Sequence, residues 1–203
     1  MNPLILFDID YTLYNTRHFI ELVNPLIMSA LNITPEELSQ TLKDYLNTLA
    51  KSTDFLPEDF LRILANNYSY SYQKLHDIYF SPELYKSSLF PDTVPALQKL
   101  YPDFNLGIFS EGFPDFQTLK LKNSGILGYF DTKYIFIYNR KTDLKILRSL
   151  PADTTILDDK SDVIQTIKQF PHLKPVWINR GLVRPDTSFA TIKTLLEIQK
   201  PDR

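Results

Sequence analysis

Two acidic residues follow an apolar segment near the start of the chain, and their spacing suits chemistry on phosphate. Residues 4–7 are uniformly apolar, and Asp8, Asp10 and Thr12 follow at alternate positions. Burial of carboxylates is unfavourable unless they are paired, hydrogen-bonded or bound to a metal. A nucleophilic carboxylate next to a second one that moves protons, with a cation near both, can transfer a phosphoryl group. An exposed acidic turn that caps a helix would give the same pattern.

Polar residues also stand at the ends of later apolar segments. Ser110 follows the segment 106–109, and the pair Asp158 and Asp159 ends the segment 155–157. Lys141 precedes a predicted helix. Because the carboxyl ends of strands in open α/β sheets form the ligand-binding edge, these side chains could join Asp8 there. Each also has a simpler interpretation, as a helix cap or as a solvated surface lysine.

Strands and helices alternate along most of the chain. Apolar runs predict strands at 4–7, 105–109, 134–138, 155–157 and 176–178. Helical periodicity predicts helices at 92–101, 114–123, 142–150 and 187–199, with a further one after the acidic pair. Single helices between strands imply right-handed crossovers and a parallel sheet covered on both faces. We therefore expect an α/β fold with a Rossmann-like, five-stranded parallel sheet flanked by helices.

Residues 16–88 interrupt this alternation with helix signals alone. Residues 34–37 form a capping box with proline at the first helical position, Pro57 and Pro82 start further helices, and Pro25 is expected to bend or interrupt a helix. We expect a core domain made of residues 1–15 and 89–203, and a helical cap domain, residues 16–88, inserted after the first strand.

Taken together, these motifs resemble the haloacid dehalogenase-like (HAD) superfamily. Its first motif, Asp-x-Asp-x-Thr after a hydrophobic strand, corresponds to Asp8-Ile9-Asp10-Tyr11-Thr12. The second is a Ser or Thr, here Ser110. The third is similar to Arg140-Lys141-Thr142-Asp143, which places its lysine at Lys141 and leaves Lys145 as the alternative. The fourth is an acidic pair with a further acid downstream, here Asp158, Asp159 and Asp162.

The resemblance implies a Mg²⁺-dependent phosphatase that works through an aspartyl-phosphate. Asp8 would be the nucleophile and Asp10 the general acid and base, while Thr12, Ser110 and Lys141 would hold the phosphoryl group or the turn. Mg²⁺ would be bound by residues drawn from Asp8, Asp10, Asp158, Asp159 and Asp162. Dehalogenases of the superfamily lack the second aspartate of the first motif, so Asp10 favours phosphate esters. A phosphomutase and a non-catalytic phosphate-binding or partner-binding protein remain alternatives.

The amino-acid composition limits the functional classes to which the protein can belong. The chain has 203 residues, 43% hydrophobic and 23% charged, with a net charge of −2 and no cysteine. Nothing in this charge balance indicates nucleic-acid binding, and the absence of cysteine excludes disulfides and thiolate catalysis. The chain has no apolar run near the roughly 20 residues that span a bilayer and no leader-like start, so a cytoplasmic location is expected.

The substrate is less constrained by the sequence. We expect a small-molecule phosphate ester, either a nucleoside monophosphate or a sugar phosphate, and a monomer or weak homodimer. Residues 16–88 contain basic residues and tyrosines that could stack on a base but more simply pack within the cap: Arg17, Arg62, Tyr68, Tyr70, Tyr72, Tyr79 and Tyr85.

Overall fold

A single parallel sheet forms the centre of the molecule. The structure is a computed structural model that describes residues 2–51, 54–181 and 188–199. The strands lie in the order β3-β2-β1-β4-β5-β6, and every pair is parallel. Their bounds are Leu4–Phe7 (β1), Asn105–Glu111 (β2), Ile135–Tyr138 (β3), Thr154–Asp158 (β4), Leu173–Ile178 (β5) and Ala190–Ile192 (β6). The expected Rossmann-like α/β class is confirmed, with one strand more than the five predicted.

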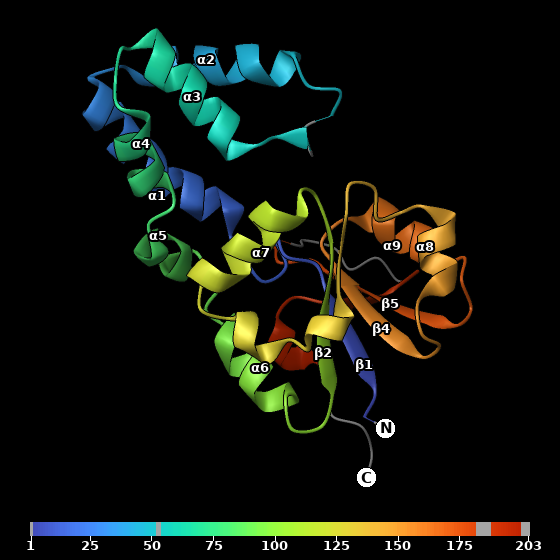
Figure 1. Ribbon diagram of the computed structural model, residues 1–203. Helices are drawn as coiled ribbons and strands as arrows, with labels where there is room; N and C mark the ends of the chain where they lie inside the picture. Colours follow the sequence, from blue (N-terminus) through green and yellow to red (C-terminus); the bar gives the residue numbers. More distant parts are fainter. Residues whose placement is uncertain (1, 52–53, 182–187, 200–203) are drawn as a thin grey trace.

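Helices cover both faces of this sheet (Figure 1). Side chains alternate across a strand, so Ile5 and Phe7 of β1 face one way and Leu4 and Leu6 the other. The first face packs against α6 (Thr93–Leu100) and α7 (Pro114–Asn123), and the second against α8 (Leu144–Ser149) and α9 (Ser161–Ile167). Because both faces of β1 are buried, all four of its residues are apolar.

The helix predicted at 187–199 is wrong over the described residues 188–199. Ala190–Ile192 instead form β6, in which Thr191 pairs with Trp177 of β5, and Leu195–Glu197 form a single 3₁₀ turn (η4). The β-branched side chains of Thr191 and Ile192 suit a strand, and pairing satisfies backbone groups that β5 would otherwise leave open at its edge. Thr187 itself lies outside the described residues.

The segment between β1 and α6 is helical. It contains α1 (Thr16–Leu31), α2 (Pro35–Asn47), α3 (Pro57–Asn67), α4 (Tyr72–Tyr79) and α5 (Pro82–Ser87), here called the cap helices. The predicted capping box is present, since Thr34 Oγ1 accepts from Glu37 N at 3.2 Å and Thr34 N donates to Glu37 Oε2 at 2.8 Å. Pro25 lies inside α1, which continues without interruption. None of the helices in the described residues is both long and apolar enough to cross a membrane.

The two chain segments that lead into and out of the cap helices lie side by side. The backbone N–H of Asn15 donates to the carbonyl of Ser88 at 2.7 Å, and Phe90 N donates to Leu13 O at 3.2 Å. Tyr14 and Leu89 form an antiparallel bridge between these hydrogen bonds. The cap helices are therefore attached to the sheet through one narrow neck, with α7 next to them on the sheet side (Figure 1).

Candidate active site

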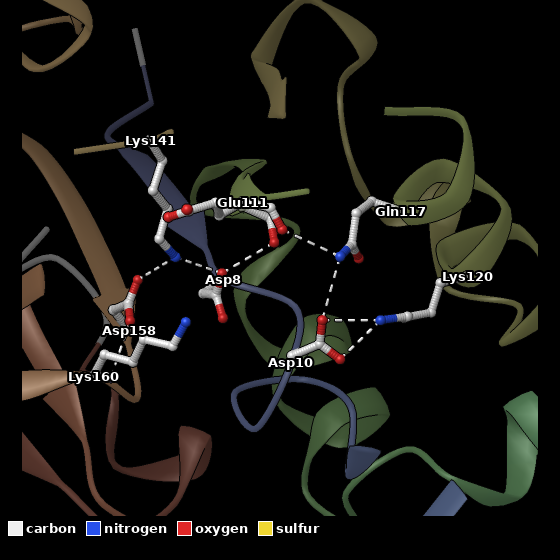
Figure 2. A network of polar contacts seen from close by, with 9 residues as sticks. Asp8, Asp10, Glu111, Gln117, Lys120, Lys141, Asp158 and Lys160 are labelled. Carbon is white, nitrogen blue, oxygen red and sulfur yellow. Dashed lines mark hydrogen bonds and ion pairs between the residues drawn. The ribbon is translucent and has the colours of Figure 1, made fainter. Parts of the chain in front are cut away.

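The carboxylate of Asp8 lies at the centre of the polar site. Asp8 follows β1 directly and is 4% exposed. Its Oδ1 accepts hydrogen bonds from Ser110 Oγ at 3.0 Å and from Lys141 Nζ at 2.6 Å (Figure 2). Ser110 is supplied by the neighbouring strand β2, as the parallel register requires. The structure therefore brings Asp8, Ser110 and Lys141 together at the carboxyl edge of the sheet.

Lys141 is buried between two carboxylates. Its Nζ lies 2.6 Å from Asp8 Oδ1 and 2.5 Å from Asp158 Oδ2. Burial alone would lower the pKa of Lys141, but the two neighbouring negative charges outweigh it and hold the pKa above its usual value. Its ammonium is thus charged in the folded protein. The alternative, Lys145, is an exposed residue of α8, so Lys141 is the lysine of this site.

An acidic cluster lies beside this lysine. Asp8, Asp158 and Asp159 each offer a carboxylate oxygen, and these atoms lie within 4.8 Å of one another. Burial raises the pKa of Asp159 to about 7, and the negative charges of Asp8 and Asp158 contribute to the increase. Asp159 Oδ1 is buried without a hydrogen-bond partner among the described residues. A cluster of mutually repelling oxygens with one unsatisfied atom suits a hard divalent cation such as Mg²⁺.

The two remaining predicted metal ligands, Asp10 and Asp162, lie outside that cluster. Asp162 is exposed in the first turn of α9, where an acidic residue favours the helix dipole. Asp10 is not part of the cluster, and its carboxylate is contacted instead by Lys120 and Gln117 (Figure 2). The sequence pattern did not separate these residues from Asp158 and Asp159.

Asp10 is held by a set of donors from α7 and α1. Lys120 Nζ lies 2.8 Å from Oδ1 and 2.9 Å from Oδ2, Gln117 Nε2 donates at 3.3 Å, and the hydroxyl of Thr16 donates to Oδ1. Burial tends to raise the pKa of Asp10, but the charge of Lys120 and these hydrogen bonds bring it below its usual value. The carboxylate is therefore ionised at neutral pH.

Local backbone geometry places these groups. Tyr11 has φ 59°, a left-handed conformation that disfavours most side chains, and its N–H donates to Tyr14 O at 2.7 Å. This turn brings Tyr14 back alongside Asp10, with which it forms a bridge. After β2, Gly112 has φ 135°, and a Cβ built there would lie 3.0 Å from Gln117 Nε2. Glycine thus leaves room for the amide that contacts Asp10.

The side chain of Thr12 is packed in the protein interior and does not hydrogen-bond to Asp10. It is fully buried, and its Oγ1 has no hydrogen-bond partner among the described residues. Its carbonyl accepts from Arg180 Nη2 at 2.7 Å, and Arg180 Nη1 also pairs with Asp92 at 2.9 Å. The guanidinium lies 3.8 Å from the ring centroid of Phe90. Arg180 therefore connects β5 to the turn that carries the acidic motif.

A cleft of about 570 Å³ opens over Asp8 and Asp10 and extends between the sheet edge and the cap helices. Besides the groups already described, Glu111 and Lys160 line it. Arg140 pairs with Asp54 in the α2–α3 connection, and its two Nη atoms lie 3.1 and 3.2 Å from that carboxylate. This ion pair joins the cap helices to the segment that supplies Lys141.

The sequence interpretation missed several polar residues of the cleft. Gln117 and Lys120 are three positions apart on α7 and so share a face of that helix. Both side chains are buried in the structure, but nothing in the sequence indicated this, because a lysine on a helix is usually solvated. Thr16 and Lys160 gave no signal beyond their positions next to the acidic motifs.

Comparison with known proteins agrees with this arrangement. A family model described as haloacid dehalogenase-like hydrolase matches residues 5–142. Because the match covers more than half of the chain, this protein belongs to the haloacid dehalogenase-like hydrolase family. The predicted family membership is confirmed. No curated protein matches the sequence.

Solved structures with the same fold come from phosphatases and dehalogenases alike. The HAD phosphatase from Thermococcus onnurineus is 25% identical with a TM-score of 0.63, over 97% of this chain and 95% of that one. The putative HAD-hydrolase YfnB from Bacillus subtilis, bound to magnesium, is 19% identical, with a TM-score of 0.60 and coverage of 97% and 96%. The 2-haloacid dehalogenase from Pseudomonas syringae pv. Tomato DC3000 is 19% identical, with a TM-score of 0.62 and coverage of 96% and 95%.

Proposed function

We propose that this hydrolase is a Mg²⁺-dependent phosphatase that acts on a small-molecule phosphate monoester through an aspartyl-phosphate on Asp8. The observation that carries the proposal is the second carboxylate, Asp10, which lines the same cleft as Asp8 and is held by Lys120. A nucleophile with a neighbouring proton carrier is what cleavage of an ester of a poor leaving alcohol needs.

In the first step, an oxygen of Asp8 attacks phosphorus and the bond from phosphorus to the ester oxygen breaks. Ser110 and Lys141 already contact Asp8 Oδ1, so they are placed to bind the oxygens of the transferring group. The departing alkoxide takes a proton through Asp10. Because Asp10 is ionised before substrate binds, that proton must arrive with the substrate, and a phosphate monoester with a second pKa of roughly 6 can bring one.

In the second step, water hydrolyses the aspartyl-phosphate. Asp10 accepts a proton from the attacking water as a new bond forms between that water oxygen and phosphorus, and the bond from phosphorus to Asp8 breaks. The lowered pKa of Asp10 suits this step, since the carboxylate is in the basic form. The products are inorganic phosphate and the free carboxylate of Asp8.

The acidic cluster would hold the metal in this scheme. Asp8, Asp158 and Asp159 supply hard oxygen ligands, and bound Mg²⁺ would neutralise negative charge on the phosphoryl group. Lys141 supplies a further positive charge between Asp8 and Asp158. Asp10 and Asp162 are not part of the proposed ligand set.

The competing activity is removal of halide from a 2-haloacid, which some proteins of the same fold perform. A halide ion leaves without a proton, so dehalogenation does not need a proton-transferring residue at the position of Asp10. A phosphomutase would use the same side chains but return the phosphoryl group to a sugar. The polar side chains that hold Asp10 favour hydrolysis of a phosphate ester over dehalogenation. Product analysis distinguishes a phosphatase from a phosphomutase.

The experiment that tests the proposal measures phosphate release from a panel of phosphate monoesters, with Mg²⁺ and with chelator, and halide release from 2-haloacids in parallel. We expect Mg²⁺-dependent phosphate release by the wild type, none by Asp8→Asn, and no halide release. Halide release without phosphate release would reject the proposal in favour of dehalogenation. Transfer to a second sugar hydroxyl in place of release would indicate a mutase.

A further inference from the structure

The cleft has two walls of different chemistry. The wall on the sheet side carries the charged groups around Asp8 and Asp10 (Figure 2). The wall formed by the cap helices is almost entirely apolar. Its principal lining residues are Phe19, Ile20, Val23, Leu46, Phe55 and Phe60. The phosphoryl group must lie against the charged wall, so the apolar wall faces whatever is attached to it.

Hydrogen-bonding groups are scarce on that apolar wall. Among the described cap residues that line the cleft, the side chains with hydrogen-bonding groups are Thr16, Asn24, Tyr79 and Tyr85, and the two tyrosines are buried. The Thr16 hydroxyl already donates to Asp10. The arginines of the cap helices pair with acids of their own helices, Arg17 with Glu21 and Arg62 with Asp59, each at 3.0 Å. Neither lines the cleft.

Large apolar side chains are exposed inside the cleft. Ile20 of α1 is 45% exposed, Leu46 of α2 is 36% exposed, and Tyr11 in the acidic turn is 43% exposed. A single exposed apolar residue needs no explanation, and Leu26 of α1, 46% exposed, lies outside the cleft. Three of them gathered around one concave site, continuous with a phosphoryl site, indicate a surface that a ligand covers.

We infer that the leaving group is a compact apolar alcohol, aromatic or alicyclic, and not a polyhydroxylated sugar. The inference rests on the proposed phosphatase function and narrows its substrate class. Transfer of an apolar ring from water to this wall is favourable in proportion to the area covered. A sugar would instead place several hydroxyls against a wall where Thr16 already donates to Asp10 and Tyr79 and Tyr85 are buried, so that Asn24 is its main accessible partner; unpaired buried hydroxyls are costly.

A matched pair of substrates tests this inference. Cyclohexylmethyl phosphate and glucose 6-phosphate are both esters of a primary alcohol on a six-membered ring, and they differ mainly in ring hydroxyls. Their intrinsic reactivities are therefore similar, and the ratio of their kcat/KM values reports contacts of the ring. We expect a ratio of at least tenfold in favour of the cyclohexylmethyl ester. Equal values, or preference for glucose 6-phosphate, would overturn the inference.

Two variants of α1 locate the effect. Ile20→Asn places an amide in the cleft, and we expect it to lower the cyclohexylmethyl preference severalfold, mainly through KM. Leu26→Asn makes the same kind of change at equal exposure outside the cleft, and we expect the wild-type ratio. Loss of the preference in both variants, or in neither, would contradict the assignment of the preference to this wall.

Failure of the proposed phosphatase function gives a different result. In that case neither ester would be hydrolysed at all, with or without Mg²⁺. Calorimetric binding of the two esters to Asp8→Asn, which cannot form the aspartyl-phosphate, then decides the preference independently of turnover. Tighter binding of the cyclohexylmethyl ester supports the inference, and equal or weaker binding rejects it.

Discussion

Lys120 contacts both carboxylate oxygens of Asp10, at 2.8 and 2.9 Å, although the two residues are 110 positions apart in the sequence. The lysine is 5% exposed, so its charge is little screened by water. This pairing keeps Asp10 ionised and fixed in position. It makes Lys120 a positioning residue for the proposed proton transfers, which leads to a first prediction.

We predict that Lys120→Met lowers kcat by roughly 10- to 100-fold, less than the ~10²–10⁴-fold contribution typical of a full general acid–base. Removal of the cation raises the pKa of Asp10, so the acidic limb of the pH–kcat profile should move to higher pH. Lys122→Met, an exposed residue of the same helix, is the control and should leave the profile unchanged. A lower kcat with an unmoved acidic limb would contradict this role.

The second prediction concerns the lysine between Asp8 and Asp158. Lys141→Met leaves two buried carboxylates without their cation, and loss of one partner of a buried pair costs about 3–5 kcal/mol of unfolding free energy. Phosphate release should fall to background. Thermal unfolding should show a large decrease in Tm that Mg²⁺ partly restores, because a bound cation would again pair the acids. Lys145→Met should match the wild type in both measurements.

The third prediction separates the acids of the fourth motif. Asp159→Asn removes a ligand of the proposed metal site, so calorimetric titration should show Mg²⁺ affinity reduced roughly tenfold or more. Asp162→Asn changes an exposed acid three residues further on and should bind Mg²⁺ like the wild type. Equal losses in the two variants would indicate that the metal lies nearer to α9 than the cluster of Asp8, Asp158 and Asp159.

The fourth prediction is about stability and pH. Asp92 is buried in part, which tends to raise its pKa, but Thr194, the N–H of Leu195 and Arg180 bring the pKa below its ordinary value of 3.8. The ionised form is thus favoured in the folded state. Its contribution is complete above the unfolded pKa and is lost as pH falls through the folded pKa.

Asp92→Asn should therefore reduce the unfolding free energy by about 1–3 kcal/mol at pH 7. The difference from the wild type should shrink as the pH is lowered below about 4. Chemical denaturation at pH 7 and pH 3 measures both values. Asp115→Asn, an exposed acid at the start of α7, should show a much smaller difference at either pH. A constant difference across the two pH values would mean that charge is not the cause.

The fifth prediction tests the ion pair that joins the cap helices to the core. Asp54→Asn removes the carboxylate that contacts both Nη atoms of Arg140. We expect KM to rise about twofold to fivefold at low ionic strength and the difference to shrink in high salt, since the pair is partly exposed. Asp59→Asn, whose partner Arg62 is on its own helix, should not change KM.

The sequence predicted the sheet and the acidic residues because each carries a strong local signal. Asp8 and Ser110 end apolar strands, and parallel pairing then brings them together. The helix at 187–199 was mispredicted because Ile192, Leu195 and Leu196 recur at the i, i+3, i+4 spacing of a helix. Only the open edge of β5 favours the strand.

Contacts across long sequence separations gave no such signal. Nothing local distinguishes Lys120, which contacts Asp10, from the exposed Lys122 two positions later. Arg180 likewise follows a segment that the sequence predicts as a strand. Its hydrogen bonds to Asp92 and Thr12 form because the folded sheet brings the end of β5 close to the turn that follows β1. The polar partners of a buried carboxylate are fixed by tertiary packing, and one sequence does not display that packing.

The neck at Asn15 and Ser88 has a consequence for how this protein could diversify. Because the insertion leaves and rejoins the sheet at one point, residues 16–88 could lengthen, shorten or be exchanged without displacing β1 or α6. Apart from Thr16, which donates to Asp10, the residues that surround Asp8 and Asp10 lie outside the insertion, so the acidic site and the apolar wall are largely separate parts of the chain. A lineage could change what it hydrolyses by altering the insertion while its reaction stays constant.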